Sequence, residues 1–272
     1  MALPDQSPPP APLLPVPTGA LVVGAEADRA AGIRLSLIIP TYNEGQNIAE
    51  LVRELSALLD PPLAGAYELI VVDDDSPDRT WAIAAELAAR TPQLRVLRRT
   101  RERCLSTAVI RGWQAARGEV LGVIDADLQH PPEITLALWE AIARGADLAV
   151  GSRHVEGGGV SDWSLARRFL SRGAQALGLV ILPRVVGRVS DPMSGYFMVR
   201  RAAIAGQVMD PLGYKILIEV LGRGAIGTIA EVGYVFRERV EGESKVTRSL
   251  YLDYLRHLLR LRLSRPRRRA PR

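Results

Sequence analysis

Two aspartates separated by one residue are the feature of this sequence best suited to binding a metal ion. Asp125 and Asp127 follow a short apolar run, 120–124, that is typical of a buried strand. Two carboxylates this close repel each other unless a cation lies between them or one is protonated. Mg²⁺ accepts one or two carboxylates and completes its shell with water and phosphate oxygens, and Gln129 offers a further oxygen. The spacing therefore indicates a divalent-metal site, with an acidic loop that caps the next helix as the alternative.

Two other apolar runs end in residues suited to binding a nucleotide. Tyr42 and Glu44 follow the run 35–39, and Asp74 follows the run 69–72. A tyrosine ring can stack on a base, and an acidic side chain after a strand commonly accepts hydrogen bonds from a ribose or a base edge. Asp78, four residues further on, is predicted to cap the next helix.

The motifs of several common nucleotide-binding classes are missing. The first predicted strand-to-helix turn has no glycine-rich dinucleotide fingerprint and no phosphate-binding loop that ends in Lys-Ser/Thr. Gln129 stands where the aspartyl-phosphatase pattern has Thr or Val. These absences disfavour dehydrogenases, P-loop nucleotidases and that class of phosphatase. A pyrophosphate would then be held by a metal ion and arginines.

The elements that position these residues alternate between buried strands and helices. Such alternation is typical of a mostly parallel α/β sheet with helices on both faces, in which ligands bind beyond the carboxyl ends of the strands. The second half of the chain is less regular. The predicted strands are 35–39, 69–72, 94–97, 120–124, 148–150, 196–199 and 228–236, and the predicted helices are 48–59, 81–89, 106–116, 134–143, 165–182, 216–221 and 250–263.

Composition and charge limit the class of protein and its partners. The chain has 272 residues, of which 47% are hydrophobic and 24% are charged, so a wholly disordered chain is excluded. Its one cysteine, Cys104, cannot form an intramolecular disulfide. Residues 256–272 contain eight arginines and no acidic residue, whereas the whole chain has a net charge of only +5. The rest of the chain is therefore mildly acidic, which disfavours nucleic acid as a partner.

The two ends of the chain differ from its middle. Residues 1–32 are rich in proline, which predicts a disordered leader rather than a secretory signal. The sequence contains no run of 18 apolar residues, so no membrane span is predicted. The basic helix at 250–263 instead predicts a surface helix on an anionic membrane, and a core-packing helix with a loose basic end is the alternative. The apolar residues predicted to share its membrane face are Tyr251, Leu255, Leu258 and Leu259.

Together these segments are similar to a known family. The chain resembles the glycosyltransferase family 2 enzymes of GT-A fold, most closely the dolichyl- or polyprenyl-phosphate mannosyltransferases, over about residues 34–260. The resemblance implies a Rossmann-like sheet and three parts: the leader (1–32), a catalytic domain (33–246), and an amphipathic basic helix with its arginine-rich tail (247–272). The segments that carry it are LSLIIPTYNE, IVVDDDSPDRT, LSTAVIRG, DADLQHPPE, GSR, SDPMSGYF, GYKILIE and GESK.

The resemblance also implies roles for individual residues. Asp125, Asp127 and Gln129 would bind Mg²⁺ or Mn²⁺. The residues that would hold the acceptor's phosphate are Arg153, Arg167 and Ser171. The residues that would bind the donor are Pro40, Tyr42, Glu44, Val72, Asp74, Ala126, Asp127, Arg239 and Lys245. The expected catalytic set is Asp127, Arg153 and Asp191.

Some of these roles keep alternatives. Asp191 would act as a base or orient a loop, and Arg167 would otherwise belong to a solvated helix face. Cys104 and Glu241 depart from the family pattern, where many relatives have Gly at the first position and some have a basic residue at the second.

The implied reaction is the inverting transfer of mannose from GDP-mannose to a dolichyl or polyprenyl phosphate. An ionised phosphate nucleophile needs positioning more than it needs a general base. The sequence agrees with this, because the one histidine beside the metal motif, His130, is predicted to be a loop residue. A family 2 transferase that uses UDP-glucose or another nucleotide sugar is the alternative enzyme. A non-enzymatic membrane adaptor is the alternative from another class. The expected location is the cytoplasmic face of a membrane, as a peripheral protein, with a separate membrane-anchoring subunit as a further partner.

Overall fold

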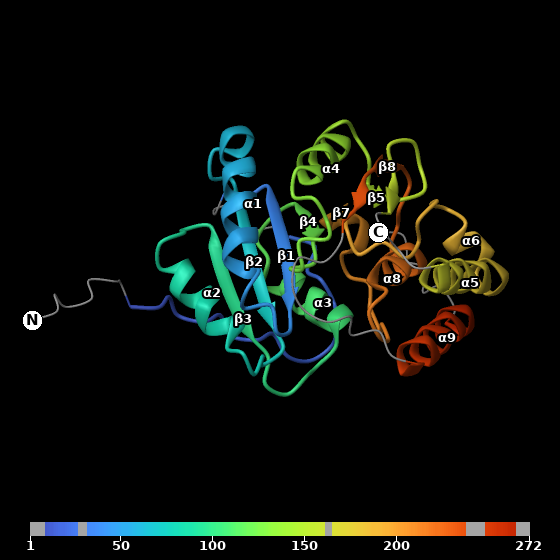
Figure 1. Ribbon diagram of the computed structural model, residues 1–272, viewed down its shortest axis with the longest axis horizontal. Coiled ribbons are helices and arrows are strands. Elements are labelled where there is room, and N and C mark those ends of the chain that lie inside the picture. The colour runs from blue at the N-terminus through green and yellow to red at the C-terminus, as the bar shows by residue number, and fades with distance from the viewer. Residues whose placement is uncertain (1–8, 27–31, 161–164, 238–247, 265–272) are drawn as a thin grey trace, which may run out of the picture.

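A mixed seven-stranded sheet forms the centre of the computed structural model, which describes residues 9–26, 32–160, 165–237 and 248–264 (Figure 1). The strands lie in the order β3-β2-β1-β4-β7-β5-β8, and β7 alone among them runs antiparallel to its neighbours. The mostly parallel α/β sheet predicted from the alternation is therefore confirmed. The strands are β1 (Leu35–Thr41), β2 (Tyr67–Asp73), β3 (Leu94–Arg98), β4 (Val120–Val123), β5 (Leu148–Ser152), β7 (Phe197–Arg200) and β8 (Ile229–Gly233).

Each helix predicted from apolar periodicity is present, within a few residues at its ends. Two short helices, α6 and α7, were not predicted because each is a single turn of four residues, too short for a periodic pattern. The helices are α1 (Ile48–Leu63), α2 (Thr80–Ala88), α3 (Leu105–Ala115), α4 (Ile134–Ala143), α5 (Leu165–Ile181), α6 (Pro183–Val186), α7 (Arg201–Ile204), α8 (Ile216–Arg223) and α9 (Arg248–Leu263).

The strand predicted at 228–236 is two strands. The chain leaves the main sheet after β8, and β9 (Val235–Phe236) pairs in parallel with the short strand β6 (Gly159–Val160). Tyr234 lies between the two pairings and is buried. This break in the sheet brings the residues that follow β8 over the end of β4, where Gln129 accepts a hydrogen bond from the Arg237 N–H through its backbone oxygen at 2.9 Å.

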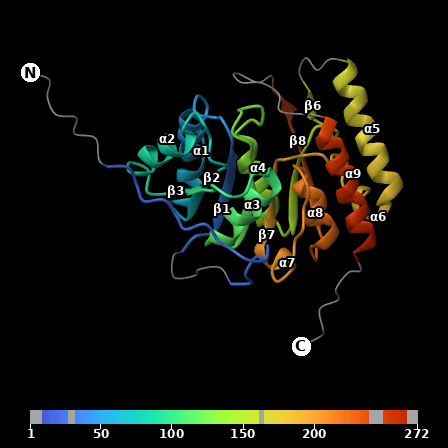
Figure 2. The same ribbon diagram turned by 90° about the horizontal axis from the view of Figure 1, so that it is seen from below.

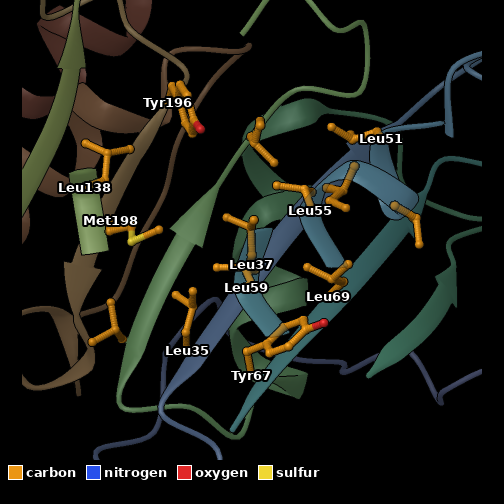
Figure 3. Close-up of a cluster of buried hydrophobic side chains, with 14 of the residues drawn as sticks. Leu35, Leu37, Leu51, Leu55, Leu59, Tyr67, Leu69, Leu138, Tyr196 and Met198 are labelled. Carbon is orange, nitrogen blue, oxygen red and sulfur yellow. The ribbon is translucent and has the colours of Figure 1, made fainter. Parts of the chain in front are cut away.

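Apolar side chains alternate between the two faces of the sheet. Leu35 and Leu37 of β1 belong to the core cluster formed with α1 and α4 (Figure 3), whereas Ile38 belongs to the cluster on the face covered by α3 and α8. Both clusters are fully buried, since strands between two helical layers need apolar residues on both faces.

The leader is partly ordered, and the prediction of disorder is wrong for residues 9–26. The Leu14 N–H donates to the Val96 carbonyl of edge strand β3 at 2.7 Å, and the Met209 N–H donates to the Leu21 carbonyl at 2.9 Å. Val23 is fully buried in the core. An edge strand leaves backbone N–H and carbonyl groups unpaired on its outer side. An extended segment can pair with them at its residues other than proline, because proline has no N–H to donate.

The helices α5, α6, α8 and α9 form a third cluster beside the sheet, and α5 and α9 lie side by side at its outer edge (Figure 2). Tyr254 and Leu258 of α9 are buried in this cluster. Their burial agrees with the alternative in which this helix packs against the core. The prediction that Leu258 faces a membrane is therefore wrong. Leu259 is 44% exposed, Leu255 is half-buried, and the side chain of Tyr251 lies outside the described residues.

A buried hydrogen-bonded pair joins α9 to α8. His257 Nε2 lies 2.7 Å from Glu219 Oε2, and neither side chain is exposed. The other oxygen of Glu219 accepts hydrogen bonds from the Asp210 N–H and from Arg223 Nε. Burial alone would raise the pKa of Glu219, but these donors outweigh it and the pKa lies below its ordinary value. None of the described helices has both the length and the apolar character needed to span a bilayer.

Glu219→Ala is expected to lower the free energy of unfolding by about 3–5 kcal/mol, because it leaves the largely buried Arg223 without its anion and the buried Nε2 of His257 without its partner. Glu140→Ala is the control, since Glu140 pairs with Arg144 at 3.4 Å on the surface, with both side chains about two-thirds exposed. That change is expected to cost less than about 1 kcal/mol. Urea unfolding measures both, and equal losses would contradict the buried pair as the link between α8 and α9.

Candidate active site

The polar residues predicted from the sequence meet at one edge of the sheet. In the parallel pairs, Thr41 at the end of β1 lies opposite Asp73 at the end of β2, and Ile38 lies opposite Val123 at the end of β4. Because β7 is antiparallel, its first residue, Phe197, lies opposite Val123. The loops after β1, β2, β4, β5 and β8 and the loop before β7 therefore converge at this edge, as expected for a ligand site in an open α/β sheet.

The acidic turn after β4 carries the two predicted metal-binding aspartates. The side chain of Asp125 is 32% exposed, whereas Asp127 is 7% exposed. Leu128 has a left-handed backbone conformation with φ of 57°, and it turns the chain so that the Gln129 N–H donates to Asp127 Oδ1 at 3.2 Å. A Cβ at Gly195 would lie 3.2 Å from Asp125 Oδ2. The absence of a side chain there gives the carboxylate its space.

The donor set of this turn fits a hard divalent cation. Carboxylate and amide oxygens are the ligands that such ions prefer. The amide nitrogen of Gln129 donates to the Arg237 carbonyl at 3.0 Å, so the amide oxygen is the atom of this side chain that would bind the cation. Within the described parts of the chain, no group of three or more His, Cys, Asp and Glu side chains could hold a metal by itself. The residues present therefore suit a cation such as Mg²⁺, which keeps water or substrate oxygens in most of its positions.

Arg153 and Asp191 form a buried two-pronged ion pair beside the acidic turn. Arg153 Nε lies 2.6 Å and Nη2 lies 2.8 Å from the two carboxylate oxygens of Asp191, which has no exposed surface. Burial opposes ionisation of Asp191, but the hydrogen bonds and charge of Arg153 outweigh it, so the pKa of Asp191 lies below its ordinary value. A carboxylate held ionised in this way is a weak base. The geometry favours the alternative in which Asp191 orients its surroundings, here the guanidinium of Arg153.

Three of the predicted donor-binding side chains lie around the ends of β1 and β2. The ring of Tyr42 has the guanidinium of Arg103 over it, 3.5 Å from the ring centroid. Glu44 is buried and accepts a hydrogen bond from Asn47 Nδ2 at 3.0 Å. Asp74 accepts hydrogen bonds from Arg99 Nε at 2.7 Å and from the Cys104 N–H at 2.9 Å.

Other residues predicted to bind the donor lie within the sheet. Pro40 and Val72 are paired neighbours in β1 and β2, and Val72 and Ala126 belong to the buried core. The structure does not bring the side chains of Val72 and Ala126 to the surface of the site. Asp78 Oδ1 accepts a hydrogen bond from the N–H of Thr80, the first residue of α2, at 3.0 Å, although the N-cap position is occupied by Arg79, which makes no side-chain capping bond.

Four of the predicted residues are not described at this site. Arg239 and Lys245, together with Glu241, lie outside the described residues. Arg167 and Ser171 lie on α5, in the part of that helix whose side chains are outside the description. Their predicted contacts with donor and acceptor phosphates remain predictions.

Two residues of the site were not anticipated in these roles. Arg99, whose side chain is 1% exposed, binds Asp74, Glu102 and the Cys104 carbonyl and so fixes the loop beside the predicted nucleoside site. His130 lies in a loop, as predicted, but it is 3% exposed and its Nε2 lies 3.4 Å from Asp125 Oδ2. His130 belongs to the segment DADLQHPPE, but neither its contact nor that of Arg99 is visible in the sequence, because each contact joins segments that are brought together only by the fold.

Comparison with known proteins agrees with this arrangement. The model of the family described as "Glycosyl transferase family 2" matches residues 36–205, which include the acidic turn, Arg153 and Asp191. The chain belongs to glycosyl transferase family 2. The matched residues extend from β1 to β7 and include the acidic turn, and these are the elements that position the candidate site.

Several members of the family are similar over most of the chain. A dolichol-phosphate mannosyltransferase of Pyrococcus furiosus is 46% identical over 84% of this chain and 64% of its own length, so this chain spans less than two thirds of that relative. One of Saccharomyces cerevisiae is 36% identical over 84% of this chain and 87% of its own length. A polyprenol monophosphomannose synthase of Mycolicibacterium smegmatis is 36% identical over 79% of this chain and 82% of its own length.

The fold is shared with solved structures of lower sequence identity. A glucosyl-3-phosphoglycerate synthase of Mycobacterium tuberculosis, in complex with Mn²⁺, UDP-glucose and phosphoglyceric acid, superimposes with a TM-score of 0.65 at 22% identity, over 86% of this chain and 81% of that one. The same enzyme was also solved with Mg²⁺ and UDP, with a TM-score of 0.58 at 23% identity. At this identity the likeness concerns the fold alone.

Asp191→Asn is expected to lower the free energy of unfolding at pH 7 by about 3–5 kcal/mol, because Arg153 stays buried without its anion. The pKa of Asp191 is lowered from 3.8, so its contribution is present above about pH 4 and is lost as the pH falls through the folded-state pKa. The difference between wild type and variant should shrink below pH 4. Urea unfolding between pH 7 and pH 3 measures it.

Asp253→Asn is the control for this prediction, because Asp253 pairs with Arg256 on the surface at 3.3 Å. Its effect should be small across the pH range. A pH-independent difference between wild type and Asp191→Asn would show that Asp191 is not held ionised by Arg153.

Proposed function

We propose that this chain transfers mannose from GDP-mannose to the phosphate of a dolichyl or polyprenyl lipid, with inversion at the anomeric carbon. The observation that carries the proposal is the 46% identity, over 84% of this chain, with a protein named dolichol-phosphate mannosyltransferase. The more distant relatives support the same acceptor class, since the name of the mycobacterial relative is polyprenol monophosphomannose synthase.

The donor side of the site combines charge with a stacking surface. Asp125, Asp127 and Gln129 are the residues that would hold Mg²⁺ or Mn²⁺, and a divalent ion there supplies Lewis-acid stabilisation of the departing diphosphate. Tyr42 offers a ring for the base, and Glu44 and Asp74 offer acceptors for base or ribose hydroxyl groups. Arg239 and Lys245 are proposed to add donors to the diphosphate.

The acceptor side requires a fixed cation rather than a base. A phosphate monoester is largely ionised at neutral pH, so its oxygen attacks without losing a proton to the protein. Asp191 accepts hydrogen bonds from Nε and Nη2 of Arg153 and so fixes the orientation of its planar guanidinium, a group whose N–H geometry matches phosphate oxygens. Arg153 therefore orients the nucleophile, with Arg167 and Ser171 proposed as its companions on α5.

The assignment of the donor is tested by offering GDP-mannose and UDP-glucose separately, with polyprenyl phosphate and Mg²⁺. Lipid-linked mannose is expected, with little product from UDP-glucose. Asp127→Ala is expected to lower transfer by at least about 100-fold, because one electrostatic contact to the transition state is commonly worth that much. Glu133→Ala, an exposed acid six residues away on the surface, is the control.

If only UDP-glucose gives a lipid-linked product, the donor is UDP-glucose and the assignment of GDP-mannose is wrong. Full transfer by Asp127→Ala, or in the presence of excess chelator, would refute the metal-dependent site. Absence of transfer with every donor, together with intact liposome binding, would favour the non-enzymatic adaptor.

The acceptor lipid requires access to a membrane, and the outer face of α5 and α9 is the proposed contact. Val180 of α5 is 78% exposed and Leu263 of α9 is 81% exposed. On α9, Leu259 and Leu263 line a shallow groove together with Arg256 and Arg260. Exposed leucines beside arginines suit an anionic membrane surface. On this proposal the enzyme is peripheral at the cytoplasmic face, held by this surface or by a separate anchoring subunit.

Leu259→Glu combined with Leu263→Glu is expected to lower partitioning onto anionic liposomes by at least about 100-fold, since each buried leucine contributes about 1.5–3 kcal/mol. Leu13→Glu combined with Val208→Glu, at exposed positions outside α5 and α9, should leave partitioning unchanged. Co-sedimentation measures both. Unchanged partitioning of the α9 variant would shift the proposal to the anchoring subunit.

A further inference from the structure

His130 lies inside a box of aromatic rings next to the acidic turn. Its ring centroid is 5.2 Å from that of Tyr196, 5.4 Å from that of Tyr234 and 5.1 Å from that of Phe236. These three rings, here called the aromatic box, come from the start of β7, the end of β8 and β9. His130 itself is 3% exposed, so packing fixes the orientation of its imidazole ring.

The two ring nitrogens of His130 have different surroundings. Nε2 faces Asp125 Oδ2 at 3.4 Å, whereas Nδ1 is buried and has no hydrogen-bond partner in the described parts of the chain. A carboxylate oxygen accepts hydrogen bonds, so a hydrogen bond between the two groups requires the proton on the nitrogen that faces Asp125. The tautomer with its proton at Nε2 has its lone pair at Nδ1, and no N–H is then buried without an acceptor.

We infer that His130 is a positioning residue that directs its Nε2–H to Asp125 Oδ2 and holds this carboxylate in the orientation that offers its other oxygen to a divalent cation. The inference rests on the proposed metal-dependent function, which it deepens. Asp125 is the partly exposed member of the acidic pair, so its side chain has the freedom to rotate away that a buried group lacks.

The surroundings of the ring argue against His130 as a direct metal ligand. A ligating Nε2 would move the proton to Nδ1, inside the aromatic box, where no acceptor is present among the described residues. Metal-bound histidines almost always donate their second N–H to a carboxylate, carbonyl or water. The box suits a fixed N–H donor, which acts on the metal through Asp125.

The aromatic box also connects the two halves of the site. The guanidinium carbon of Arg153 lies 5.6 Å from the ring centroid of Phe236, on which His130 also packs. One rigid group of rings therefore supports both the carboxylate beside the donor and the arginine beside the acceptor.

The test measures Mn²⁺ binding to the full chain in the presence of saturating GDP, by the loss of the free-ion paramagnetic resonance signal. His130→Phe and His130→Leu remove the N–H that faces Asp125 and keep an apolar side chain in the aromatic box. Each is expected to weaken Mn²⁺ binding by about 10- to 100-fold, the loss typical of outer-shell partners. His130→Gln places an amide N–H near the position of Nε2 and should restore most of the affinity.

Two controls separate positioning from folding. Thermal unfolding must show that each variant is folded, and the leucine variant replaces the phenylalanine variant if the larger ring does not fit. Asp253→Asn changes a surface pair with Arg256 on α9, outside the aromatic box and the acidic turn, so it should leave Mn²⁺ binding unchanged.

Wild-type Mn²⁺ affinity in folded His130→Phe or His130→Leu would overturn the inference. Equal loss in His130→Gln and His130→Leu would overturn it too, because it would make His130 a ligand. The readout is independent of transfer: the expected binding pattern without any lipid-linked mannose would refute the proposed function and leave the role of His130 intact.

Discussion

Pairing of buried carboxylates with cationic side chains is the constraint on which this structure depends. A buried carboxylate is stable only when donors and an opposite charge replace its water. Asp191 has Arg153, Asp74 has Arg99, and Glu219 has Arg223 on its own helix α8. Arg153 and Arg99 reach their carboxylates from distant segments of the chain, and His257 of α9 contacts Glu219 at 2.7 Å, so these contacts hold the loops of the site and the outer helices in place.

The acidic turn follows the same rule with a different solution. Asp125 and Asp127 lie two residues apart, and their mutual repulsion is relieved best by a cation of higher charge than one arginine provides. The proposed divalent ion therefore completes the pairing of this site in the way that arginines complete it elsewhere. On this view, electrostatic balance of the protein and stabilisation of a leaving diphosphate come from one interaction.

The reversed strand β7 explains how donor and acceptor residues come together. It places residues 191–196 beside the ends of β4 and β5, so Asp191 reaches Arg153, and Gly195 lies against Asp125. A parallel strand at this position would present its amino end at the opposite edge. The mixed sheet is therefore a requirement of the site.

Much of the fold was predictable because strands and helices leave a periodic signal in the sequence. The alternation of strand and helix patterns over residues 34–150 predicts the sheet. The acidic residues after β2 and β4 indicate the edge of the sheet at which the site lies. The order of residues 9–26 was not predictable, because it depends on an edge strand that exists only in the folded protein. The burial of Leu258 depends likewise on α5 and α8, since an amphipathic helix has the same pattern whether its apolar face meets protein or lipid.

The contacts between chemical groups were the least predictable part of the site. Arg99, one of four arginines between 98 and 103, reaches Asp74, and nothing in the sequence distinguishes it from the others. His130 was predicted as a loop residue, and its burial by three rings from distant segments became visible only in the fold. The side chains of Val72 and Ala126 lie in the core, and their predicted contacts with the donor stay predictions.

The decisive measurement is a crystal structure of the protein with GDP and Mn²⁺, with data collected at the manganese absorption edge. We expect an anomalous peak between Asp125 and Asp127, with diphosphate oxygens next to it. A nucleotide bound elsewhere, with no peak at this turn, would contradict this expectation.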